Sequence, residues 1–184
     1  MQQHRYQDLV TLFEETFFNQ YNTRLVKGEA EPVYLPANEQ CQYHQVVFAH
    51  GYYSSALHEI AHWCIAGQSR RLLEDYGYWY LPDGRNREQQ NKFEHVEIKP
   101  QALEWAFCVA ANKSFNVSAD NLNGCEVDTT QFRLNVYQQV QRYLKEGFPK
   151  RAQQFIDALA NHYQVNVPLT LSQFELDTEL YPHV

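Results

Sequence analysis

The sequence predicts an α+β fold that is mainly helical, with a small β-sheet and a metal site on one helix. Long stretches place apolar residues at the three- and four-residue spacing of amphipathic helices, whereas only a few short segments are rich in β-forming residues. One of the helical stretches contains the H-E-x-x-H pattern His58-Glu59-Ile60-Ala61-His62. A chain of 184 residues (1–184) fits a single domain and can bury a core without disulfides.

The first predicted helix covers residues 5–21, where the apolar side chains recur on one face: Tyr6, Leu9, Val10, Phe13, Phe17 and Tyr21. Two strands are predicted next. Residues 32–36 form a short extended piece bounded by prolines, which is typical of an edge strand. Residues 45–49 are rich in β-formers and lead through His50 and Gly51 into the next helix, so His50 lies close to the H-E-x-x-H pattern in sequence.

Residues 55–66 predict the helix that carries the two histidines. Ser54 or Ser55 can cap its N-terminus, and Gly67 can end it. Side chains four positions apart lie on the same face of a helix, so His58 and His62 can direct two imidazole nitrogens at one point. That arrangement is a chelate for one divalent metal ion.

The aromatic run at residues 76–81 predicts a strand, followed by a turn at 82–85. Residues 86–111 predict a helix interrupted at Pro100, which either kinks near Glu97 or begins again at the proline. Residues 112–128 predict a long irregular connection. Two further helices are expected: one opened by a capping box at Asp128 and ending at Gly147, and one that starts at Pro149.

Composition sets limits on location and partners. The N-terminus lacks the apolar stretch of a secretory signal and no window is long and apolar enough for a membrane span, so we expect a soluble, cytoplasmic protein. The formal charge of −7 argues against direct nucleic-acid binding and suits a basic partner, or equally a role in solubility. The four cysteines form no C-x-x-C pair and are expected to be free thiols: Cys41, Cys64, Cys108 and Cys125.

Two imidazoles need a third protein ligand. The acidic helical stretch offers Glu94, Glu97 and Glu104, and Glu97 is best placed because the helix bends or ends just beyond it. Gln101, four residues on, could hydrogen-bond the Glu97 carboxylate.

The residue pattern leaves two chemistries open. In a zinc metallopeptidase or hydrolase, Glu59 is the general base for a metal-bound water; in a non-haem iron oxygenase it lies outside the ligand set. A jelly-roll dioxygenase using His95-Val96-Glu97 would need many more strands than this chain predicts.

Several segments resemble the bacterial elongation factor P hydroxylase family. They are F-A-H-G-Y-Y-S-S-A-L-H-E-I-A-H-W-C-I-A-G (48–67), G-Y-W-Y (77–80), P-D-G-R (82–85), V-E-I-K-P-Q-A-L-E-W (96–105) and F-N-V-S (115–118). The resemblance implies a metal-dependent monooxygenase, with Fe(II) as the metal and O₂ as co-substrate. It also implies elongation factor P as the protein substrate, hydroxylated on its β-lysylated lysine.

Carried over by motif, the resemblance makes His58, His62 and Glu97 the metal ligands. Glu59 is then the candidate catalytic residue, as a proton-handling or second-layer group. We further expect an acidic side chain near the metal, Asp83 or Glu94, to guide the cationic substrate. Aromatic neighbours are expected to add cation–π contacts: Tyr52, Tyr53, Tyr78 and Trp79.

Overall fold

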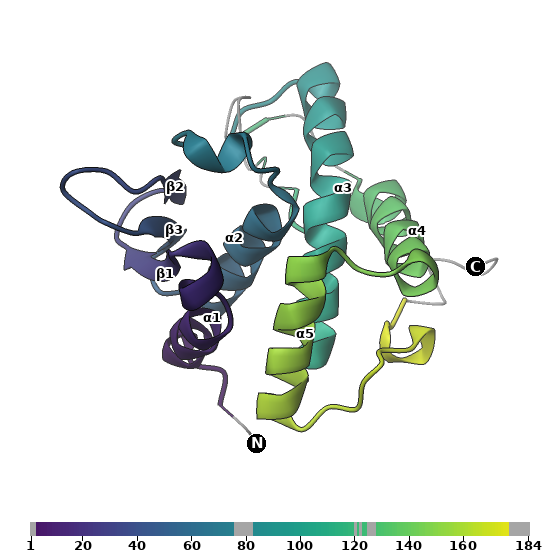
Figure 1. Cartoon of the computed structure of the whole chain (residues 1–184). Helices are drawn as coiled ribbons and strands as arrows, with labels where there is room; N and C mark the ends of the chain where they lie inside the picture. The colour runs from purple at the N-terminus through teal and green to yellow at the C-terminus, as the bar shows by residue number, and fades with distance from the viewer. Residues whose placement is uncertain (1–2, 76–82, 120, 122, 125–127, 177–184) are drawn as a thin grey trace.

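The computed structural model describes residues 3–75, 83–119, 121, 123–124 and 128–176. Within them, helices dominate and a small sheet lies at one side of the molecule (Figure 1). The α-helices are α1 (Tyr6–Tyr21), α2 (Tyr53–Ile65), α3 (Arg87–Ala110), α4 (Thr129–Glu146) and α5 (Lys150–Tyr163). The strands are β1 (Thr23–Gly28), β2 (Val33–Leu35) and β3 (His44–Ala49). The predicted mainly helical α+β class is confirmed.

The sheet has the order β1-β3-β2, with β1 parallel and β2 antiparallel to the central β3. The strands expected at residues 32–36 and 45–49 are confirmed as β2 and β3, and β2 lies at the edge as its flanking prolines indicate. Strand β1, which begins two residues after α1 ends, was not among the predicted strands. Its alternation of buried Thr23 and Leu25 with more exposed neighbours is the signal that could have revealed it.

The start of α2 differs from the prediction. The cap residue is Tyr52, without a side-chain cap, and both serines lie inside the helix. The Ser55 hydroxyl instead accepts a hydrogen bond from the backbone N–H of Ala49, at 3.1 Å. The serine therefore ties the end of β3 to the first turn of α2, and the helix ends at Ile65, two residues before Gly67.

Helix α3 is continuous through Pro100, so the expectation that a new helix begins at the proline is wrong. Its N-terminus has a full capping box, in which Asn86 and Gln89 bind each other's backbone N–H groups. At the start of α4, where a capping box was expected at Asp128, the Asp128 carboxylate accepts a hydrogen bond from the Thr130 N–H, but the Gln131 side chain donates to Asn135 instead of reaching back to the cap.

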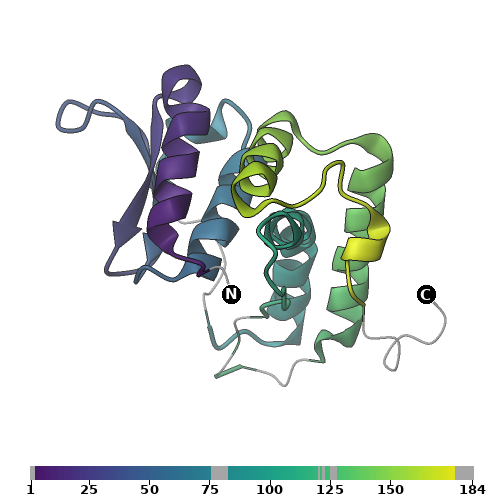
Figure 2. The ribbon, with the colours of Figure 1, turned by 90° about the horizontal axis from the view of Figure 1, so that it is seen from below.

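The core lies between the sheet and the helices. Figure 2 shows α1 and α2 beside the sheet, followed by α5 and α3, with α4 on the far side. Phe13, Phe17 and Trp63 join α1 to α2 through edge-to-face ring contacts, and Phe155 extends this cluster to α5. On α3, four residues at helical spacing are fully buried: Leu103, Ala106, Phe107 and Ala110.

Among the described cysteines, Cys41, Cys64 and Cys108 are free thiols, as expected, while Cys125 and the aromatic run at 76–81 lie outside the described residues. A search of the described helices finds none with the length and apolar character that a membrane crossing requires.

Candidate metal centre

Two histidines from α2 and one glutamate from α3 converge where these helices pack together. His58 and His62 are one helical turn apart, and their Nε2 atoms lie 3.0 Å from each other. The Glu97 carboxylate reaches both, with Oε1 3.2 Å from His62 Nε2 and Oε2 3.5 Å from His58 Nε2. One potential ligand atom from each of the three residues lies within 4.8 Å of the others.

This donor set fits a divalent metal ion. Two imidazole nitrogens and one carboxylate form the facial triad of non-haem iron sites, and the same donors occur in catalytic zinc sites. Both leave coordination positions open for small molecules. The chemistry of the donors therefore favours a catalytic centre over a structural one, which is usually closed by four protein ligands.

A second carboxylate fixes the ring of His58. The Glu104 Oε2 atom lies 2.9 Å from His58 Nδ1, so the ring donates its Nδ1–H to Glu104 and presents Nε2 to the cluster. Burial lowers the pKa of His58, but the hydrogen bond to Glu104 and the charge of Glu97 outweigh it and raise the pKa to about 10. Glu104, one of the three glutamates considered as a third ligand, thus holds the ring of His58 and lies outside the cluster.

Glu97 is 2% exposed, and its negative charge is stabilised inside the protein. Burial raises the pKa of this carboxyl, yet the neighbouring His62 and His58 lower it to about 2, and a hydrogen bond from Gln101 contributes in the same direction. Gln101 is itself held by the connection after α3, because it exchanges two hydrogen bonds with the backbone of Ser118, at 2.8 and 3.0 Å. The predicted support of Glu97 by Gln101 is therefore confirmed.

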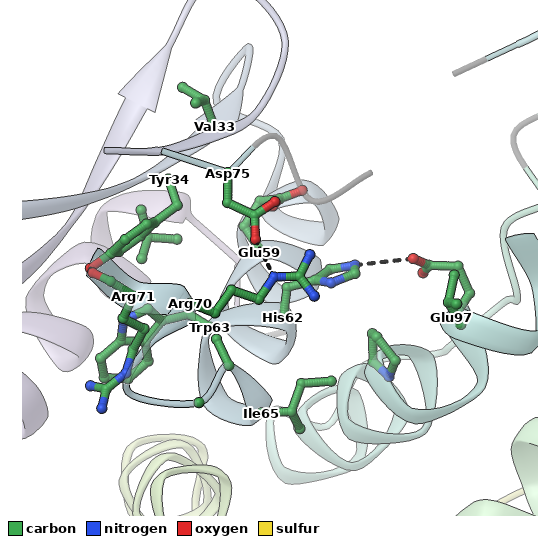
Figure 3. Close-up of a pocket in the computed structure, with 15 residues that line it drawn as sticks. Val33, Tyr34, Glu59, His62, Trp63, Ile65, Arg70, Arg71, Asp75 and Glu97 are labelled. Carbon is green, nitrogen blue, oxygen red and sulfur yellow. Dashed lines mark hydrogen bonds and ion pairs between the residues drawn. The ribbon is translucent and has the colours of Figure 1, made fainter. Parts of the chain in front are cut away.

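A pocket of about 330 Å³ opens beside the cluster (Figure 3). His62, Glu97 and Glu59 contribute to its lining. Burial raises the pKa of the Glu59 carboxyl, against the lowering effect of the two histidines. Further lining residues come from α2 and α3, and part of the wall comes from segments that the sequence did not connect with the site, including Tyr34 on β2 and Arg70 and Asp75 after α2.

Other predicted site residues lie elsewhere. In the part of the chain that the structure describes, Asp83, Glu94, His50, Tyr52 and Tyr53 belong neither to the cluster nor to the pocket lining. Asp83 accepts hydrogen bonds from the backbone of Gly84 and Asn123, and Glu94 accepts one from Gln90.

The four aromatic residues expected to give cation–π contacts near the metal have different outcomes. Tyr53 is buried with its hydroxyl bonded to that of Tyr163, while Tyr52 is 64% exposed. Tyr78 and Trp79 lie outside the described residues.

Comparison with known proteins agrees with this geometry. The model of the elongation factor P hydroxylase family matches residues 12–174, a range that includes the whole cluster. The chain is also 51% identical over 174 residues to the elongation factor P lysine hydroxylase of Haemophilus influenzae, covering 95% of this chain and 98% of that protein. The chain therefore belongs to the elongation factor P hydroxylase family, a family of protein-modifying hydroxylases.

Proposed function

We propose that this protein is a metal-dependent monooxygenase that uses Fe(II) and O₂ to hydroxylate the β-lysylated lysine of elongation factor P. The observation that carries the proposal is the convergence of two imidazoles and one buried carboxylate beside a pocket that His62 and Glu97 help to line. Family membership and the name of the Haemophilus relative, an elongation factor P lysine hydroxylase, supply the reaction class and the substrate protein.

In this proposal His58, His62 and Glu97 hold the metal, and Fe(II) supplies the redox chemistry that O₂ activation requires. The chain's own residues do the remaining work. Glu104 keeps the proton of His58 on Nδ1 and so leaves Nε2 available as a ligand. The pocket admits a side chain from the substrate protein and shields it from water.

The first test measures the mass of elongation factor P. The β-lysylated factor is incubated with the iron-loaded enzyme, O₂ and a reductant, and a gain of about 16 Da, one oxygen atom, is expected. Matched incubations without iron or with zinc in its place should give no gain. Cleavage of unstructured peptides by the zinc-loaded enzyme, stopped by Glu59→Gln, would instead support the H-E-x-x-H hydrolase and contradict the proposal.

The second test concerns the ligands. We expect His58→Ala, His62→Ala and Glu97→Ala each to lose stoichiometric metal and hydroxylation while keeping the helical circular dichroism of the wild type, because most of the core lies elsewhere. Metal content is measured after anaerobic reconstitution. Glu94→Ala is the control, since this glutamate lies one turn earlier on α3 and outside the cluster. Full metal occupancy in Glu97→Ala, with loss in Glu94→Ala, would move the third ligand to Glu94.

A further inference from the structure

The pocket beside the cluster combines apolar walls with acidic groups (Figure 3). Its apolar lining includes residues from α2, α3, β2 and β3: Ile65, Pro100, Val33 and Val46. Its acidic side chains are Glu59, Asp75 and Glu97. Apolar walls with a few charged groups suit a ligand made of an aliphatic chain with a charged end.

Two of these three acids already have partners. Glu97 lies between the two histidines of the cluster. Asp75 forms an ion pair with Arg70, and its backbone pairs with Tyr34 of β2. Neither carboxylate is available for a new partner without breaking these contacts.

Glu59 differs from both. The residue is partly buried on α2, and its carboxylate forms no hydrogen bond or ion pair with another residue in the described ranges. The nearby arginines are engaged elsewhere, since Arg70 holds Asp75 and the Arg71 guanidinium lies over the ring of Tyr21, 5.5 Å from its centroid. Removing a carboxylate from water is costly unless a donor or cation compensates for it. A cationic ligand in the pocket would supply that compensation.

We propose that Glu59 binds an ammonium group of the substrate's aliphatic side chain and thereby determines specificity for a cationic substrate. This inference rests on the proposed function and deepens it. Glu59 and His62 are three residues apart on α2, so their side chains are neighbours, with Cβ atoms about 5–6 Å apart. When Glu59 holds the ammonium group, the aliphatic carbons a few bonds from that group therefore face the cluster of His58, His62 and Glu97. In this role Glu59 is a binding residue, and the proton of the reaction does not pass through it.

The experiment compares two forms of elongation factor P. One carries the β-lysylated lysine, and the other carries a hexanoyl group on the same lysine, which keeps the six-carbon chain and lacks both amines. Binding of each form to the metal-free enzyme is measured by titration calorimetry. A hydrogen bond to a charged group predicts that the wild type prefers the cationic form by roughly 10- to 100-fold.

Glu59→Gln, which keeps the shape and removes the charge, should abolish this preference and leave the affinity for the hexanoyl form unchanged. The control is Glu15→Gln, because Glu15 is exposed on α1 and its replacement changes the net charge by the same amount. This variant should keep the preference. Thermal melting of both variants checks that they fold.

With the iron-loaded enzyme, Glu59→Gln should raise KM for the β-lysylated factor by a similar ratio and leave kcat within a few-fold of the wild type. Equal affinities of the wild type for the two forms, or a preference that survives in Glu59→Gln, would overturn the inference. A preserved preference with a kcat lowered by roughly 10²- to 10⁴-fold would assign Glu59 to proton transfer. A wild type that discriminates between the forms but adds no oxygen would contradict the proposed function and leave this inference standing.

Discussion

At the scale of single residues, the proton on Nδ1 of His58 determines which ring nitrogen faces His62 and Glu97. His58 has two ring nitrogens, and Glu104 accepts the proton of Nδ1 at 2.9 Å. The other nitrogen then points at His62 and Glu97, where a metal needs an unprotonated donor. Glu104 is 8% exposed, so the contact is sheltered from water and the ring orientation is well held.

We therefore expect Glu104→Gln to lower metal affinity by roughly 10- to 100-fold, as is typical when the carboxylate behind a ligating histidine is replaced. The fold should be retained, because glutamine has nearly the same shape. Affinity is measured by competition with a chelator, and the exposed Glu146→Gln on α4 is the control. If Glu104→Gln binds metal as tightly as the control, Glu104 has no part in orienting His58.

At the scale of elements, α3 carries three functional side chains on one face. Glu97, Gln101 and Glu104 follow one another at spacings of four and three residues, so they form a continuous row along the helix. Glu97 and Glu104 meet the histidines of α2, and Gln101 binds the connection at Ser118. In the proposed metal site, α3 would thus supply the ligand Glu97, the side chain of Gln101 that supports it, and the carboxylate of Glu104 that supports His58.

Arg85, which lies just before α3, also binds the connection that follows α3, close to Ser118. Arg85 is fully buried, with its guanidinium 3.9 Å from the centroid of the Phe93 ring. It donates to the Gln90 side chain at 2.9 Å and to the Ala119 carbonyl at 2.7 Å. Asn121 exchanges two hydrogen bonds with the Arg85 backbone. Arg85 is the last residue of the P-D-G-R segment, to which the sequence assigned only a connecting role and a resemblance to the family. It anchors the connection that also holds Gln101.

We expect Arg85→Lys to lower the free energy of unfolding by about 2–4 kcal/mol, because lysine cannot reproduce the planar fork of donors and leaves buried acceptors without a partner. Urea unfolding followed by circular dichroism measures the change. Arg87→Lys, exposed at the first position of α3, should change stability by about 0.5 kcal/mol at most. Equal stabilities of the two variants would show that the buried guanidinium contributes nothing specific.

At the scale of the whole molecule, buried thiols and phenols, which are neutral at pH 7, limit the stability of the fold at alkaline pH. Burial raises the pKa of the Cys64 and Cys108 thiols above the ordinary value of 9.0. Burial likewise raises the pKa of the phenol of Tyr53, and it raises that of Tyr143 to about 12 from 10.0. In each case the folded protein holds the proton more tightly than the unfolded chain.

The stability that these groups contribute is therefore fully present at a pH below their pKa values in the unfolded chain. It is lost as the pH rises through their pKa values in the folded protein. We expect the free energy of unfolding to fall progressively from about pH 9 to about pH 12, as measured by urea titrations at several pH values. Tyr143→Phe, which cannot ionise, should fall less steeply above about pH 10 than the wild type. A free energy of unfolding that stays constant from about pH 8 to about pH 11 would contradict this prediction.

Local periodicity is what the sequence determined by itself. The helical repeat of 3.6 residues predicts both the buried stripe of α1 and the alignment of His58 with His62, because both depend on neighbours within a few positions. The edge position of β2 followed in the same way from its prolines. The place of Glu97 just before Pro100 and the resemblance to the hydroxylase family both indicated Glu97 as the third ligand, and the ligand role of the three residues stays a prediction.

Only the tertiary structure decided which side chains meet at the site and how β1 pairs, because these features depend on contacts between segments far apart in the chain. Spacing on α3 offered three glutamates, and only the packing of α2 against α3 brings Glu97 to the histidines and Glu104 to the opposite side of His58. The same packing excludes Glu94 and Asp83 from the pocket and gives Glu59 a place in its wall. Strand β1 gains its role from pairing with β3, across about twenty residues of chain that local patterns do not connect.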